Sequence, residues 1–403
     1  IELDKHPKIL NFIHDFFAND NDGFTLEYIR LVAMGLIHGQ GKYISQYLFK
    51  PNNVVLEELK HIDEKETWSV FENHRQYILD LLSPTGRSNH TKFSREDAKP
   101  FPFISLAEQS EEKERYESIG KDTVREGKMI HFEPGGGSAT RFRNSYSDFL
   151  DFPIFSVHSS LGTERREQFD KDKHQKSIYP IAPISGKSFL AVQFQRRIAT
   201  CLKLAQIEGR NIVPAKLPIT LIMVTKSTRE EVEKYLEENE YFGLQCVIVE
   251  EQDEFCRLKD CEENAGEVIP IDDMGTLSKT GNGIGAMFQI LNRSEFRGRR
   301  LLDYLKAEDI KIMSMGNCDN ASIKGESRWG HLGRMIENRL GMLIASVPKS
   351  VPHKKVGLFV LAKKKLFYED YKDNEDDYVV AAIEYADRTD EFNTLEFNTG
   401  NTN

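Results

Sequence analysis

The fold class of this chain is decided by the stretch Ile219-Thr220-Leu221-Ile222-Met223-Val224-Thr225. Its centre, Leu221–Val224, is a continuous apolar run, which is typical of a strand that is covered on both faces. Such strands occur mainly in parallel sheets, because helices pack on either side of them. The stretch therefore predicts a central strand of an α/β domain.

Strand-like and helix-like stretches alternate around this strand from about residue 126. We expect further strands at 129–132, 246–250, 310–315, 356–361 and 379–384, and amphipathic helices at 189–204, 229–238 and 331–343. This alternation predicts a mostly parallel sheet. Residues 1–125 instead carry apolar residues at helical spacing and lack strong strand patterns, which predicts an N-terminal, mainly helical region. We therefore expect two parts, 1–125 and 126–403.

Composition limits the classes of function. The chain has 403 residues, of which 39% are hydrophobic and 29% charged, as in globular proteins with a proper core. It has no apolar run long enough for a transmembrane helix, so no membrane partner is expected. A net charge of −10 disfavours a broad nucleic-acid-binding face, and the basic run 296–300 is interpreted as a solvated helix start. Five cysteines without a C-x-x-C pattern favour reduced thiols and a cytoplasmic location.

A glycine-rich stretch directly follows the expected strand at 129–132. It reads Gly135-Gly136-Gly137-Ser138-Ala139-Thr140-Arg141. Successive glycines let backbone N–H groups approach an anion or a flat base, because no Cβ is in the way. Thr140 and Arg141 add a hydroxyl and a cation. The stretch matches neither the P-loop nor the dinucleotide pattern. It predicts a nucleoside triphosphate site, and a flexible glycine turn is the alternative.

Three further polar residues stand out, two of them because ligands of parallel α/β sheets bind beyond the carboxyl ends of the strands. Asp319 follows the strand at 310–315 and is either a Mg²⁺ ligand or the N-cap of a helix. Gln252 follows the strand at 246–250 and either pairs with a base edge or is an ordinary surface residue. Lys176 either reaches phosphates or is one of many surface lysines.

Taken in chain order, these motifs resemble those of the eukaryotic-type UDP-sugar pyrophosphorylases. The resemblance rests on the glycine loop at 136–141, Tyr-Phe-Gly-Leu at 241–244, Gly-Asn-Gly at 281–283 and Phe-Asn-Thr-Gly-Asn at 397–401. It covers the chain from about residue 126 to the last residue. It implies a Rossmann-like, doubly wound mixed sheet of the nucleotidyltransferase type, which is similar to the glycosyltransferase-A fold. The family's small C-terminal domain is expected to be absent from this chain.

The resemblance also implies an activity in nucleotide-sugar biosynthesis. The family's enzymes are Mg²⁺-dependent uridylyltransferases that convert UTP and a sugar 1-phosphate into a UDP-sugar and pyrophosphate. The sugar is expected to be N-acetylglucosamine 1-phosphate or glucose 1-phosphate. The implied roles are catalysis for Arg141, Lys176 and Lys349; nucleotide binding for Gly136, Gly137, Thr140, Gln252, Gly281 and Asn282; sugar binding for Asn320, Glu384, Tyr385, Asn398 and Asn401; and Mg²⁺ binding for Asp319.

The glycine loop departs from the family pattern, because Ala139 stands where the family has glycine. Two other functions therefore stay open. The chain could be a catalytically weak relative that binds a UDP-sugar, or a glycosyltransferase that uses a UDP-sugar as donor. The sequence does not select the sugar or the oligomeric state.

Overall fold

The computed structural model describes the chain over a set of ranges, and the fold is given for these. They are residues 5–18, 26–47, 53–65, 67–68, 71, 73, 76, 95–101, 110–135, 175–180, 185–208, 217–244, 246–259, 265–318, 328–344, 346–349, 351, 357–364, 377–383, 390–392, 394, 396–397 and 399–401. The chain packs as two compact units, one of residues 1–92 with 254–282, the other of residues 93–253 with 283–403. The domain division expected at residue 125 stays a prediction.

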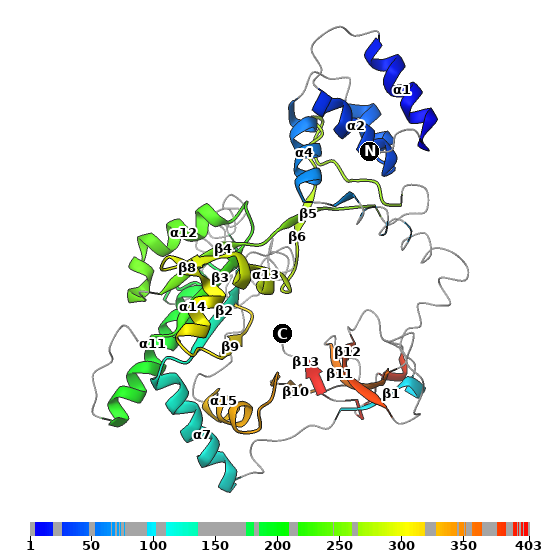
Figure 1. Cartoon of the computed structure of the whole chain (residues 1–403). Coiled ribbons are helices and arrows are strands. Elements are labelled where there is room, and N and C mark those ends of the chain that lie inside the picture. Colours follow the sequence, from blue (N-terminus) through cyan, green and yellow to red (C-terminus); the bar gives the residue numbers. More distant parts are fainter. Residues whose placement is uncertain are drawn as a thin grey trace, which may run out of the picture. The chain divides into compact units, whose positions relative to one another are not determined.

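The first unit combines helices from the start of the chain with a hairpin from far along it. Its helices are α1 (Pro7–Ala18), α2 (Leu26–Ile37), α3 (Gly41–Tyr47) and α4 (Asn53–Glu64). Its strands β5 (Glu254–Cys256) and β6 (Lys279–Gly281) pair antiparallel. Figure 1 shows these elements next to one another, with the hairpin coloured yellow-green beside blue helices.

Buried contacts make residues 254–282 part of this unit. Both segments contribute to one hydrophobic core, which includes Leu31, Ile44, Leu59, Val268 and Leu277. The Gln40 side chain donates to the carbonyl of Gly266 at 2.8 Å and accepts from the N–H of Val268 at 2.9 Å. The Tyr43 hydroxyl donates to the carbonyl of Gly275 at 2.6 Å. Buried hydrogen bonds of this kind fix the segment in one position, because leaving such groups unpaired is costly.

The second unit contains a four-stranded parallel sheet (Figure 1). Its strands are β2 (Met129–Pro134), β3 (Ile219–Val224), β4 (Val247–Glu251) and β9 (Ile312–Met315), in the spatial order β4-β3-β2-β9. All three strand pairs are parallel. The chain therefore proceeds from β2 outward to β4 and then returns to place β9 on the other side of β2. The expected parallel α/β sheet is confirmed.

Helices cover both faces of this sheet, because successive strand residues point to opposite sides. Leu221 belongs to a core cluster with residues of α13 (Ala286–Arg293) and α14 (Leu301–Ala307). Ile222 and Val224 belong to another cluster, with residues of α11 (Phe189–Glu208) and α12 (Arg229–Glu238). All six side chains of β3 are buried. The apolar run of β3 thus serves two cores at once.

Helix α11 begins where the sequence predicts it. The Ser188 hydroxyl accepts a hydrogen bond from the N–H of Ala191 at 3.0 Å, which caps an otherwise unpaired N–H of the first turn. The helix has 20 residues. Within the described ranges, no helix combines the length and apolar content that crossing a membrane requires.

Helices α7 (Ser110–Arg125) and α15 (Arg328–Glu337) approach each other at two glycines. A Cβ on Gly120 would lie 2.0 Å from the carbonyl oxygen of Trp329, and one on Gly333 would lie 1.8 Å from that of Tyr116. Neither position can hold a side chain without moving the helices apart. Helix α15 also begins and ends earlier than the helix expected at 331–343.

The last two expected strands do not continue the parallel sheet. β11 (Leu358–Lys363) and β12 (Tyr378–Ile383) pair antiparallel, in a sheet with β1 (Ala98–Pro100), β10 (Ser346–Pro348) and β13 (Thr399–Asn401). The expectation that these two strands extend the main sheet is wrong, because they belong to a separate sheet. Burial alternates towards the end of β12, as is typical of an antiparallel strand with one exposed face.

The basic run at 296–300 forms a hairpin and not the first turn of a helix, although its last residue, Arg300, is the N-cap of α14. Strands β7 (Glu295–Phe296) and β8 (Arg299–Arg300) pair around Arg297 and Gly298. Both turn residues have positive φ, 51° and 73°, as a two-residue hairpin turn of type I′ requires. Helix α14 begins only after β8. The arginines after the turn are exposed, as expected.

Four of the five cysteines lie in the described ranges, and they are buried free thiols: Cys201, Cys246, Cys256 and Cys318. Burial raises the pKa of Cys201 to about 11. Burial, with a smaller contribution from the Glu58 carboxylate, raises the pKa of Cys256 to about 12. The thiols of Cys201 and Cys256 are therefore protonated at neutral pH, which makes these two poor nucleophiles and poor metal ligands.

Candidate nucleotide site

The order of the parallel strands defines a candidate site. The chain leaves β2 towards β3 on one side and returns to β9 on the other, and ligands of such sheets bind where the strand order reverses. The glycine stretch follows β2, and Asp319 follows β9 after three further residues. The two strands that lead to these motifs are neighbours, with Phe132 opposite Met315. The topology therefore brings the starts of both predicted motifs to one edge.

Gly135, the first residue of the glycine stretch, is anchored at this edge. Its N–H donates to the carbonyl of Met223 at 2.8 Å. A Cβ at this position would lie 3.1 Å from a side-chain carbon of Ile222, which leaves little room for any other residue. The loop therefore departs from a fixed point directly beyond β2.

The segment that carries Lys176 is fastened to this same point. The buried Ser177 hydroxyl donates to the carbonyl of Gly135 at 3.3 Å. The carbonyl of Ser177 in turn accepts from the N–H of Leu190 in the first turn of α11, at 2.9 Å. Lys176 is half-buried. The structure thus places Lys176 next to the start of the glycine stretch, as the phosphate-binding hypothesis requires.

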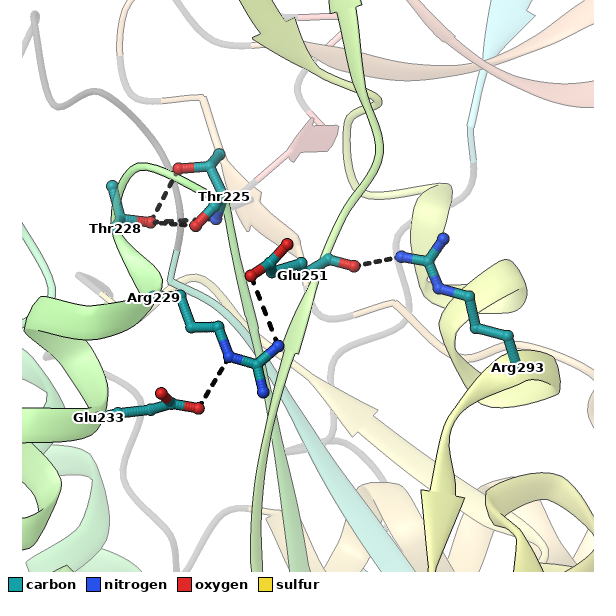
Figure 2. Close-up of polar contacts among 6 residues, drawn as sticks. All are labelled: Thr225, Thr228, Arg229, Glu233, Glu251 and Arg293. Atoms are coloured by element: carbon teal, nitrogen blue, oxygen red, sulfur yellow. Dashed lines mark hydrogen bonds and ion pairs between the residues drawn. The ribbon is translucent and has the colours of Figure 1, made fainter. Parts of the chain in front are cut away.

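A turn of hydroxyl side chains follows β3. The N–H of Thr225 donates to Oγ1 of Thr228 at 3.0 Å, and the hydroxyl of Thr228 lies 2.8 Å from that of Thr225 (Figure 2). Helix α12 begins at the next residue. A polar turn therefore follows this strand, and its hydroxyl groups bond mainly to one another.

Gln252, directly after β4, has a side-chain oxygen without a hydrogen-bond partner. Its N–H donates to the carbonyl of Val224 at 2.8 Å, so its backbone is fixed to β3. Its side chain is 9% exposed, and Oε1 is buried without a hydrogen-bond partner. A buried amide oxygen without a partner costs about 1–3 kcal/mol, so it marks a place where a ligand donor fits. The expectation of an ordinary surface residue is wrong at this position.

Helix α11 contributes buried polar contacts that the sequence analysis missed. Nε2 of Gln193 donates to the carbonyl of Cys318 at 3.3 Å, directly before Asp319. One turn later, Arg197 forms an ion pair with Glu133 of β2 and donates to Oγ1 of Thr220 at 3.1 Å. The signal was available, because a glutamate within an apolar strand requires a cationic partner when it is buried.

Two residues predicted to contact the sugar 1-phosphate lie in or directly beside the antiparallel sheet. Lys349 is 3% exposed, and its ammonium donates to the carbonyl of Phe392 at 2.9 Å. Asn401 lies in β13, opposite Ser346 of β10. Because β10 pairs with β13 and Lys349 directly follows β10, the two residues belong to neighbouring parts of one sheet. Their contact with a sugar stays a prediction.

Gly281 and Asn282 belong to the first unit. Gly281 ends β6 opposite Glu254, and Asn282 follows it. Their role in nucleotide binding stays a prediction. Nine other expected site residues lie outside the described ranges, and their roles also stay predictions: Gly136, Gly137, Thr140, Arg141, Asp319, Asn320, Glu384, Tyr385 and Asn398.

The described residues contain no group of three or more metal-binding side chains. A Mg²⁺ ion that binds with a nucleotide does not need such a group, because one or two carboxylates, phosphate oxygens and water complete its shell. The predicted donor Asp319, one residue beyond Cys318, is an oxygen ligand of the required kind. The donor chemistry at the end of β9 is therefore compatible with Mg²⁺.

Comparison with known proteins supports the predicted family. UDP-N-acetylglucosamine diphosphorylase 2 from Arabidopsis thaliana is 25% identical over 269 residues, which are 65% of this chain and 45% of that protein. No protein-family model matches the sequence. The chain spans less than half the length of the curated relatives it matches.

Two solved structures share the fold. The uridine diphosphate N-acetylglucosamine pyrophosphorylase from Trypanosoma brucei has a TM-score of 0.61 at 18% identity, over 94% of this chain and 66% of that one. A putative UDP-N-acetylglucosamine pyrophosphorylase from Entamoeba histolytica has a TM-score of 0.54 at 19% identity, over 75% of this chain and 64% of that one.

Proposed function

Because the chain belongs to the UDP-sugar pyrophosphorylase family, we propose that it transfers a uridylyl group from UTP to a sugar 1-phosphate. The products are a UDP-sugar and pyrophosphate. The strand order, with both faces of the sheet covered, supports a Rossmann-like, doubly wound domain as the framework. We place the reaction where that order reverses, between the ends of β2 and β9.

The hydrogen bond between Ser177 and Gly135 carries the proposal. It fixes a lysine-bearing segment beside a glycine loop at the edge where phosphates bind in such sheets. The amide oxygen of Gln252, which has no hydrogen-bond partner, can accept a hydrogen bond from the N–H of a uracil ring. Phosphate recognition and base recognition thus arise from separate elements of one unit.

The reaction needs positioning and charge neutralisation. An oxygen of the sugar phosphate attacks the α-phosphorus of UTP in line, and the bond to the leaving pyrophosphate breaks. Lys176 and Arg141 hold the triphosphate and stabilise the charge that develops on the leaving group. Lys349 and Asn401, with Asn398 and Glu384, orient the sugar phosphate. Fixing both substrates in this geometry replaces a bimolecular encounter and lowers the entropic part of the barrier.

Mg²⁺ would be held by Asp319 and by phosphate oxygens, where it supplies further neutralisation of phosphate charge. The preferred sugar is N-acetylglucosamine 1-phosphate, because the relatives are named for that sugar. The buried free thiols of the described residues support the proposed cytoplasmic location.

The test is a pyrophosphate-release assay with UTP and a panel of sugar 1-phosphates, with and without Mg²⁺, with mass detection of the nucleotide sugar. We expect pyrophosphate and a UDP-sugar only with Mg²⁺. Lys176→Ala should lower kcat by about 10²–10³-fold while the protein stays folded. Release of UDP would indicate a glycosyltransferase. Binding of a UDP-sugar without turnover would indicate a catalytically weak relative, and either result would reject the proposal.

A further inference from the structure

The outer side of strand β4 carries an unusual contact. β4 lies at one end of the sheet order within the described ranges, so no described strand pairs with its outer side. The guanidinium of Arg293, in the last turn of α13, donates to the carbonyl of Glu251, the last residue of β4 (Figure 2). An arginine side chain thus donates the hydrogen bond that a neighbouring strand would otherwise supply.

The same guanidinium reaches beyond Gln252. Its NH1 group lies 2.8 Å from Oδ1 of Asp253. Arg293 therefore holds the residues directly before and directly after Gln252, while the N–H of Gln252 itself is bonded to Val224 on the inner side. The planar guanidinium suits this arrangement, because its donors have fixed directions and can bond two acceptors at once.

A second arginine holds the side chain of Glu251. NH1 of Arg229 lies 3.5 Å from the Glu251 carboxylate, and Nε of Arg229 donates to Glu233 at 2.9 Å. Although burial opposes it, bonding to Glu233 and attraction by Glu251 and Glu250 raise the pKa of Arg229. Figure 2 shows Arg229 and Arg293 on opposite sides of Glu251. Glu251 is thus held through its side chain by α12 and through its backbone by α13.

These contacts suggest a role for Arg293 in positioning Gln252, and this role rests on the function proposed above. We propose that Arg293 is a positioning residue that sets the base selectivity of the nucleotide site by fixing Gln252. An amide oxygen selects a base only when it lies at the right distance and angle from the base edge, so its selectivity depends on how firmly the backbone that carries it is held. Arg293 provides that rigidity without touching the nucleotide.

The contact is suited to a mutational test because it contributes little to stability. The Arg293 side chain is 42% exposed, and ion pairs of a side chain this exposed contribute little to the free energy of unfolding. Arg293→Ala should therefore fold. The matched control is Arg115→Ala, because Arg115 forms a similarly exposed ion pair with Glu337 at 3.0 Å, between α7 and α15.

The experiment measures kinetics and hydrogen–deuterium exchange on the full chain. In Arg293→Ala we expect KM for UTP to rise about tenfold, which corresponds to the loss of roughly one or two hydrogen bonds. The kcat and the KM for the sugar 1-phosphate should change little. Selectivity for UTP over CTP should fall, and exchange at residues 247–253 should increase. Arg293→Lys should lie between Arg293→Ala and the wild type, and Arg115→Ala should match the wild type.

Unchanged exchange at 247–253 in Arg293→Ala would overturn the role, whatever the activity. So would equal losses for both substrates, or unchanged selectivity between UTP and CTP. A wild-type protein that neither binds nor turns over uridine nucleotides would instead overturn the proposed function. Exchange in the variant would then still show whether Arg293 holds the strand.

Discussion

The hydroxyl of Ser177 and the carbonyl of Gly135 lie 3.3 Å apart in a buried hydrogen bond, although the two residues are far apart in the sequence. This bond joins the Lys176 segment to the glycine stretch. It converts two weak motifs, a glycine run and a lysine, into parts of one site.

Ser177→Ala tests this bond. The carbonyl of Gly135 would lose the hydroxyl donor, and the segment that carries Lys176 would be held less firmly. We expect a loss of about 1 kcal/mol in the free energy of unfolding. We also expect kcat to fall about tenfold, because a misplaced cation stabilises the leaving group less well. Urea denaturation and steady-state kinetics measure the two effects. The control is Ser45→Ala, which removes an exposed hydrogen bond from the Ser45 hydroxyl to the carbonyl of Lys42. A normal kcat in Ser177→Ala would show that the bond does not position Lys176.

Gln252→Leu should weaken nucleotide binding without lowering the free energy of unfolding. The substitution removes a buried amide oxygen that has no partner, so the free energy of unfolding should stay equal or rise by about 1 kcal/mol. Nucleotide binding should weaken at least tenfold, because the base loses its amide partner. Denaturation and calorimetric titration with UTP check both parts. If the variant binds UTP like the wild type, Gln252 does not contact the base.

Substitutions of Glu133 and Arg197 should have coupled effects on the free energy of unfolding. Either Glu133→Met or Arg197→Met leaves one charge buried without its partner, which should cost about 3–5 kcal/mol of stability. The double variant should be more stable than either single variant, because both charges are removed together. A double-mutant cycle of unfolding free energies measures the coupling. Additive effects of the two substitutions would show that the pair is not coupled.

Burial of thiols predicts a loss of stability at alkaline pH. In the folded protein the pKa of Cys256 is raised from 9.0 to about 12. The protonated thiol is therefore favoured by folding, and its contribution is complete below pH 9 and declines as the pH rises towards 12. The loss should approach about 1.4 kcal/mol for each pH unit.

Unfolding of Cys256→Ala, compared with the wild type between pH 8 and pH 11, isolates this effect. The wild type should lose stability more steeply with pH than the variant, and the slope is the readout because the smaller side chain also lowers stability at every pH. Parallel curves would contradict the shifted pKa.

The parallel sheet was predictable because its signal is local. A run such as Leu221–Val224 is apolar at every position, and this pattern belongs to strands with two covered faces. Helix α12 was predicted with the observed bounds, Arg229–Glu238, because its amphipathic spacing is regular. The later strands were placed correctly along the chain, but not in their sheet, since strand pairing depends on contacts that no short window contains.

The site was only partly predictable for the same reason. The sequence singled out Gln252 through the rule that ligands bind beyond parallel strands, and Lys176 through the resemblance to the family. It did not reveal that Arg293 holds the residues on both sides of Gln252, because the sequence around an exposed arginine does not show which groups accept its hydrogen bonds. The hairpin at 295–300 was misread because a cluster of arginines resembles an exposed helix, whereas the positive φ of Arg297 is set by the turn.

The first unit is assembled from two stretches of chain, and this has a consequence for biosynthesis. Its early helices bury Leu31, Ile44 and Leu59 against side chains such as Val268 and Leu277, which the ribosome makes much later. While the intervening residues are being translated, the early helices lack part of their interior. Their apolar faces therefore stay accessible to chaperones until the late segment emerges, and a nascent chain that pauses before it should aggregate more readily than one that pauses after it.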